Sequence, residues 1–231
     1  MSLMACACML WKAFKLLVME QYLKNTFFID HESDAIRAFV ANIDFSKAQT
    51  DVEKAVRLYY AVRDGFRYNP HNISLQPEDF RASIQVQRAE GHCIDKATIL
   101  AAAARAIGVP SRLGFANVTN HIGTEKIEKV LGINVLVFHG FTELYLGGRW
   151  VKATPAFNAA LCEKLDVEPL EFNGKEDSVF QQFSRTGNRF MEYLHNYGSF
   201  DDLPFDQMIG EWKKYYPKLF TYNIKQLVIR D

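Results

Sequence analysis

The spacing of apolar residues predicts amphipathic helices in the first ninety residues. Helices are expected over residues 34–41 and around residues 80–88. Between them, Thr50 and Glu53 have the spacing of a capping box, in which each side chain bonds to the other residue's backbone N–H, and the helix they open should run to near Gly65. Residues 8–23 also show a helical period of apolar side chains, carried by Leu10, Phe14, Leu17 and Val18.

The pattern changes to β-structure after residue 110. Strands are expected over residues 111–118, 133–146 and 149–153, and Gly147-Gly148 is typical of a two-residue hairpin turn between the last two. A polar loop is expected over 120–129, a short helix over 156–164 and a surface loop over 171–186. Helices are expected over 187–196 and 204–215, and a short helix or strand over 222–229. No repeat or linker interrupts this order, so we expect one domain over residues 1–231.

A two-residue turn fixes the register of the hairpin. Glu143 then pairs with Lys152, Tyr145 with Trp150 and Leu146 with Arg149. Since strand residues alternate between faces, His139 and Glu143 share a face with Lys152 and Thr154. This register predicts an ion pair between Glu143 and Lys152, and it places Thr154 diagonally across from His139. A bulge would shift the register by one residue.

Strong helix formers follow Cys93, and Gly108 and Pro110 provide a stop signal. Cys93 is therefore expected in the first turn of a helix, where unpaired N–H groups and the helix dipole favour a thiolate and lower the pKa of a thiol. A single cysteine is more often a small buried apolar residue. The downstream His139 favours the chemical interpretation, because a cysteine and a histidine can together form a nucleophile and its general base.

Composition excludes some classes of protein. The chain has 231 residues, of which 48% are hydrophobic, and its 27 Lys and Arg balance 27 Asp and Glu. No nucleic-acid or membrane partner is expected from this charge balance, and the apolar N-terminal stretch is too short to span a bilayer and lacks the features of a signal peptide. The four cysteines form no C-x-x-C pair, which favours a reducing, cytoplasmic location. Cys6 and Cys8 have no further ligand pair in sight, so no metal or other cofactor is expected.

Three stretches together resemble the transglutaminase-like superfamily. Residues 58–70 resemble its helix and following extended segment. Residues 91–112 resemble its nucleophile motif, G-x-C-x-x-x-A followed by R-A-x-G-I-P-x-R, and residues 139–151 resemble its histidine hairpin, H-x-W-x-E-v-y-l-x-g-x-W. The three stretches occur in the order and at the spacing of the superfamily, and the resemblance covers about residues 50–157.

The resemblance implies a papain-like α+β fold with a nucleophile helix packed on an antiparallel sheet. It implies Cys93 as nucleophile and His139 as general base and acid. The third residue of the superfamily is usually Asp, and that position is Thr154 here, with Asn158 as a substitute. Gln87 lies six residues before Cys93, as the oxyanion-hole glutamine does in papain-like enzymes, although a solvated helix glutamine is the simpler interpretation.

Histidines and aromatic residues outside these motifs are open to two interpretations. His121 is a candidate for the rim of the cleft, and His92 directly precedes the nucleophile, although a surface or structural role is favoured for both. The aromatic residues of the C-terminal third are expected in the core, with lining of the cleft as the alternative. These are Phe180, Phe183, Phe190, Tyr193, Tyr197 and Phe200.

Two functions remain open. The first is a cysteine-dependent acyl-transfer enzyme that cleaves amide or peptide bonds through a thioester and acts on a protein or peptide substrate. Hydrolysis by a protease or amidase is favoured over cross-linking, because bacterial members of the resembled superfamily are more often hydrolases. The alternative is a catalytically degenerate peptide-binding or scaffold module, which Thr154 in the aspartate position favours. The sequence leaves the substrate and the oligomeric state undetermined.

Overall fold

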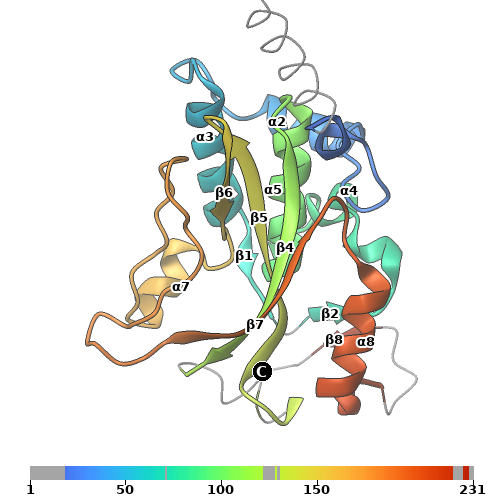
Figure 1. Cartoon of the computed structure of the whole chain (residues 1–231), viewed down its shortest axis with the longest axis vertical. Coiled ribbons are helices and arrows are strands. Elements are labelled where there is room, and N and C mark those ends of the chain that lie inside the picture. Colours follow the sequence, from blue (N-terminus) through green and yellow to red (C-terminus); the bar gives the residue numbers. More distant parts are fainter. Residues whose placement is uncertain (1–18, 71, 122–127, 129–130, 221–225, 229–231) are drawn as a thin grey trace, which may run out of the picture.

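A computed structural model gives the structure of the protein and describes residues 19–70, 72–121, 128, 131–220 and 226–228. The fold is α+β, with helices packed against an antiparallel four-stranded sheet of order β6-β5-β4-β7 (Figure 1). The sheet strands are β4 (Ser111–Asn120), β5 (Val135–Leu146), β6 (Arg149–Ala153) and β7 (Met191–Phe200). Two small sheets pair β1 (Arg67–Tyr68) with β3 (Glu90–Gly91), and β2 (Asn72–Ser74) with β8 (Gln226–Val228).

Side-chain caps mark the start of α2 and α3. The expected helix over 34–41 is α2 (Asp34–Ala41), capped by Ser33. The capping box of Thr50 and Glu53 is present at the start of α3 (Asp51–Gly65). The remaining helices are α4 (Ala82–Gln85), α5 (Cys93–Ala106), α7 (Ala159–Lys164) and α8 (Phe205–Tyr215), with 3-10 turns η1 (Gln21–Leu23), η2 (Pro77–Phe80) and η3 (Pro217–Phe220).

Helix α5 is the central element of the fold. Every residue from Ile94 to Arg105 is buried, because α2, α3 and α4 pack on the helix from one side and the sheet from the other (Figure 1). Alanines at 101–104 keep the helix slender enough for this packing. The side chain of Thr142 on β5 donates a hydrogen bond of 2.8 Å to the carbonyl of Ala97 and so ties the sheet to the helix.

The register predicted for the hairpin is confirmed. Glu143 pairs with Lys152 and Leu146 with Arg149, and positive φ angles of 57° and 90° at Gly147 and Gly148 form the turn. The ion pair expected between Glu143 and Lys152 is wrong. Glu143 instead binds the guanidinium of Arg112 on its other neighbour, β4. The reason is that β5 lies between two strands, whereas the hairpin by itself supplies only one.

The helix expected over residues 187–196 is also wrong, because this segment leads into the strand β7. Its aromatic residues recur at helical spacing, but β4 offers an unpaired edge, and pairing with that edge decides the conformation. Register shifts against β4 and a positive φ of 89° at Gly198 explain why the strand lacks a clean alternation.

The other expectations have mixed outcomes. The helix over 204–215 is confirmed as α8, whereas α4 and α7 are shorter than expected. The segment over 222–229 contains the strand β8 rather than a helix. Most of the expected helix over 8–23, both Cys6 and Cys8, and most of the loop over 120–129 lie outside the described residues. Among the described residues, none of the helices has the length and apolar character needed to cross a bilayer.

Candidate active site

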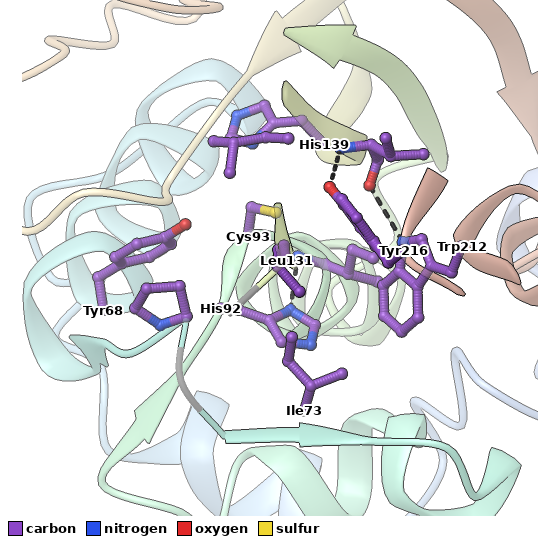
Figure 2. A pocket seen from close by; sticks show the side chains of 12 residues that line it. Tyr68, Ile73, His92, Cys93, Leu131, His139, Trp212 and Tyr216 are labelled. Carbon is purple, nitrogen blue, oxygen red and sulfur yellow. Dashed lines mark hydrogen bonds between the residues drawn. The ribbon is translucent and has the colours of Figure 1, made fainter. Parts of the chain in front are cut away.

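A pocket lies where the N-terminus of α5 meets β5 (Figure 2). Cys93 is the first residue of α5, and His139 lies on β5, so the two residues paired by sequence reasoning line the same pocket. His92 caps α5, because its Nδ1 accepts a hydrogen bond from the backbone N–H of Ile94. The rest of the lining consists of the apolar and aromatic residues Tyr68, Pro70, Ile73, Ile94, Leu131, Leu136, Val137, Trp212 and Tyr216.

Burial dominates the electrostatics of Cys93. It raises the pKa of the thiol to about 12, and the negative charge of Asp95 acts in the same direction. Hydrogen bonds from backbone N–H groups, of which that of Gly140 is the strongest, act to lower the pKa but do not outweigh burial. The lowered pKa expected from the helix N-terminus alone is therefore wrong for this site.

The pKa of His139 is lowered, whereas that of Cys93 is raised. Burial lowers the pKa of its imidazole to about 4, and the nearby His92 contributes to the same shift. Only 4% of His139 is exposed, and its Nδ1 has no hydrogen-bond partner. At neutral pH the site therefore holds a neutral thiol beside a neutral imidazole.

Gly140 allows β5 to approach α5 closely. A Cβ at this position would lie 3.1 Å from the Cα of Ile94 and 3.3 Å from the ring of Phe115. The absence of a side chain at Gly140 therefore brings its N–H to the sulfur of Cys93. The same approach places the strand residue His139 at the end of the helix that carries Cys93.

A backbone irregularity directly precedes His139. Phe138 has a φ of 63°, which is rare for a bulky residue, and the pairing with β4 shifts register between Ala116 and Val118. The amide of Phe138 donates a hydrogen bond of 3.0 Å to the side chain of Asn117. Bulges of this kind redirect the side chains that follow them, which here include His139.

Helix α8 holds the residue before the bulge. The N–H of Val137 donates to the hydroxyl of Tyr216 at 2.6 Å, and its carbonyl accepts from the indole of Trp212 at 3.1 Å (Figure 2). The Tyr216 hydroxyl in turn donates to the carbonyl of Val135. Trp212 of α8 and Tyr216, the residue directly after α8, therefore fix both polar groups of Val137 and supply a wall of the pocket.

A family comparison identifies the superfamily of this chain. A model of the transglutaminase-like superfamily matches residues 37–155, over half of the chain, and this match includes α5, which begins with Cys93, and the β5–β6 hairpin, which carries His139. The chain belongs to the transglutaminase-like superfamily. A search of curated proteins finds no match. A crystal structure from Cytophaga hutchinsonii, named as a candidate cysteine protease, is similar with a TM-score of 0.44 and 15% identity, over 78% of this chain and 53% of that one.

The chain thus spans about half the length of that Cytophaga protein. Membership of the transglutaminase-like superfamily supports a cysteine-based enzyme. Within the described residues, no group of three or more His, Cys, Asp or Glu side chains could hold a metal ion.

Thr154, at the position of the superfamily's aspartate, follows the end of β6 and is buried. Its backbone is fixed, because its N–H donates to the carbonyl of Ser178 and its carbonyl accepts from the hydroxyl of Tyr59. Its Oγ1, however, has no hydrogen-bond partner, and neither has the Nδ1 of His139. The side chains of Thr154 and His139 are therefore not hydrogen-bonded to each other in this structure.

The other candidate residues point elsewhere. The Oδ1 of Asn158 accepts from the backbone N–H of Tyr68, and the exposed Gln87 donates to the carbonyl of Ser83. His121 lies 3.9 Å from Glu192. None of the three candidates lines the pocket with Cys93 and His139.

The aromatic residues of the C-terminal third are only partly in the core. Phe190 is buried, as expected, but 56% of Phe183 and 38% of Tyr193 are exposed. Trp212 and Tyr216 line the pocket instead, and sequence reasoning did not single them out. The sequence does contain a signal that these two residues are buried. Met208, Trp212 and Tyr216 recur every four residues, which places them on one face of α8 and its C-terminal end, and all three are buried.

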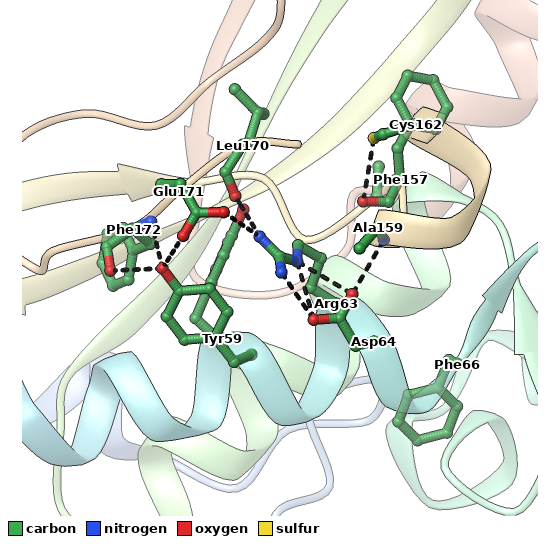
Figure 3. A network of polar contacts seen from close by, with 12 residues as sticks. Tyr59, Arg63, Asp64, Phe66, Phe157, Ala159, Cys162, Leu170, Glu171 and Phe172 are labelled. Atoms are coloured by element: carbon green, nitrogen blue, oxygen red, sulfur yellow. Dashed lines mark hydrogen bonds and ion pairs between the residues drawn. The ribbon is translucent and has the colours of Figure 1, made fainter. Parts of the chain in front are cut away.

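A buried polar network centred on Lys96 packs next to the site. The ammonium of Lys96, three residues after the nucleophile, donates hydrogen bonds of 2.8 Å to the carbonyls of Arg63, Phe66 and Ala156. Burial lowers the pKa of Lys96 to about 7. Beside it, Arg63 binds Asp64 and Glu171 (Figure 3). These contacts join α5 to the end of α3 and to the segment after Thr154.

Proposed function

We propose that the protein is a cysteine-dependent acyl-transfer enzyme that cleaves an amide or peptide bond through a thioester. The observation that carries the proposal is that Cys93 and His139 line one pocket at the N-terminus of a buried helix. Hydrolysis is favoured over cross-linking, so the enzyme would be a protease or amidase with a protein or peptide substrate. A cytoplasmic location fits the lack of cysteine pairs that would form a disulfide framework.

In this proposal His139 acts as a general base toward a neutral thiol. The imidazole takes the thiol proton as the sulfur of Cys93 attacks the carbonyl carbon, and the resulting imidazolium protonates the departing amine. The thioester is then hydrolysed when His139 removes a proton from the attacking water. The backbone N–H of Cys93, which has no partner within its helix, is suited to stabilise the oxyanion.

The pKa shifts support this order of events over a preformed ion pair. A thiol with a pKa of about 12 beside an imidazole with a pKa of about 4 stays neutral until substrate binding brings the electrophile to the sulfur. A substrate carbonyl that gains charge in the transition state is then stabilised by the nearby backbone N–H groups.

The test compares two free cysteines of the same chain. We expect iodoacetamide to alkylate the partly exposed Cys93 at least tenfold faster than the fully buried Cys162, because the reagent can reach Cys93 and His139 can accept its proton during the attack. His139→Ala should slow the reaction of Cys93 alone. Mass spectrometry of the labelled peptides measures both rates. Equal rates at the two cysteines, unaffected by His139→Ala, would refute the proposal.

A second assay separates hydrolysis from transfer. A peptide-amide library offered with and without a fluorescent primary amine distinguishes a free acid product from an amine adduct. The competing function, a degenerate peptide-binding module, is favoured by the unpartnered Thr154 hydroxyl. It predicts that peptides bind to the wild type and to Cys93→Ala alike, with no turnover by the wild type.

A further inference from the structure

The described walls of the pocket beside Cys93 carry no carboxylate, ammonium or guanidinium group. Among the described residues that line it, none is Asp, Glu, Lys or Arg, and the polar side chains are the two histidines, the cysteine, two tyrosines and one tryptophan. Ile73, Leu131, Leu136 and Val137 supply aliphatic surface between them. A charged ligand group would therefore find no opposite charge in this wall.

The polar atoms of Trp212 and Tyr216 are already engaged. The indole N–H of Trp212 and the hydroxyl of Tyr216 both bind the backbone of β5 at Val137 (Figure 2). The Tyr216 hydroxyl also donates to the carbonyl of Val135. Because these bonds turn the polar ends of both side chains toward the strand, the rings present carbon surface to the pocket. The polar groups of Val137 are used in the same contacts.

The pocket is also small. Its free volume is about 50 Å³. An engineered apolar cavity that binds benzene has a volume of about 150 Å³. A group clearly smaller than an aromatic ring is therefore the natural occupant.

We propose that this pocket binds a short, uncharged aliphatic side chain of the acyl donor, next to the carbonyl that Cys93 attacks. The inference rests on the proposed function and names its substrate class. Charged side chains are rejected because, among the residues that the structure describes, the pocket offers no partner for a buried charge. Trp212 and Tyr216 lie beyond the residues matched by the superfamily, 37–155, so this chain adds the selective wall itself.

Three matched chloromethyl ketones test the inference. N-acetylated valine, lysine and glutamate derivatives differ only in the side chain, and each alkylates a reactive cysteine. We expect the valine reagent to label Cys93 at least tenfold faster than the other two, after each rate is divided by the rate that the same reagent shows with free cysteine. Equal normalised rates would overturn the inference.

A substitution in the wall supplies the second arm. Leu136 is half-buried on β5 and lines the pocket, so Leu136→Lys places a cation there, and Leu136→Met serves as the apolar control. The ratio of the glutamate rate to the valine rate should be at least tenfold higher in the lysine variant than in wild type. The methionine variant should keep the preference for valine, and a preference unchanged in both variants would contradict the assigned pocket.

The same design separates failure of the inference from failure of the proposed function. Iodoacetamide carries no side chain, so it reports on the reactivity of Cys93 alone. If it labels Cys93 and Cys162 equally, the proposed function fails. The pocket is then tested in Cys93→Ala by the indole N–H resonance of Trp212, which N-acetylvaline amide should shift and N-acetyllysine amide should not. Equal shifts would overturn the inference.

Discussion

Replacing the buried Lys96 by methionine tests how the site is supported. The substitution keeps an unbranched side chain, one atom shorter than lysine, but leaves the carbonyls of Arg63, Phe66 and Ala156 without their donor. Each unpaired buried carbonyl costs about 1–3 kcal/mol, and relief from burying a charge offsets part of that loss. We therefore expect the free energy of unfolding to fall by about 2–4 kcal/mol at pH 7.

The pH dependence gives this prediction a distinctive sign. The pKa of Lys96 is lowered by burial from 10.5 to about 7, so between these values the unfolded chain binds the proton that the folded chain has lost. Stability from this group therefore rises with pH above 7, with a limiting slope of about 1.4 kcal/mol per unit, and by about 2 kcal/mol between pH 7 and pH 9. Lys96→Met lacks this gain, so the gap between the two proteins should widen.

Urea unfolding at several pH values, followed by circular dichroism, measures the gap. Lys47→Met at an exposed position is the matched control and should change stability by less than about 0.5 kcal/mol at every pH. A gap between wild type and Lys96→Met that stays constant from pH 7 to pH 9 would refute the reasoning. It would mean that the three carbonyls keep the ammonium charged despite its burial.

Two further substitutions test the surroundings of His139 and Cys93. Thr154→Asp places a carboxylate at the superfamily's aspartate position, so we expect the pKa of His139 to rise from about 4 by more than one unit. NMR titration of the imidazole measures this pKa. The control Thr154→Asn adds no charge and should leave the pKa of His139 near its wild-type value. Gly140→Ala places a methyl group 3.1 Å from the Cα of Ile94, so it should lower the free energy of unfolding by about 1–3 kcal/mol and slow the alkylation of Cys93. Gly210→Ala meets open space and should leave stability unchanged or raise it. Equal effects of the two alanines would contradict the close approach of β5 to α5.

Local sequence patterns determined the elements whose signals are short-range. The capping box of Thr50, the stop at Gly108 and the glycine turn of the hairpin each act within a few residues, and the structure contains all three where they were expected. The hairpin register follows from turn length alone, so the pairing of Glu143 with Lys152 was also predictable. The position of Cys93 at the start of α5 was predictable because a glycine precedes it and a run of helix formers follows it.

Tertiary structure decided everything that depends on which elements become neighbours. β7 is a strand because the edge of β4 needs a partner, and Glu143 binds Arg112 because β4 lies on its other side. Burial by distant elements, rather than the helix N-terminus, sets the pKa of Cys93. Periodicity cannot foresee these outcomes, since desolvation and strand pairing arise only when segments far apart in the sequence pack together. For the same reason, Trp212 could be predicted as buried but not as a wall of the pocket.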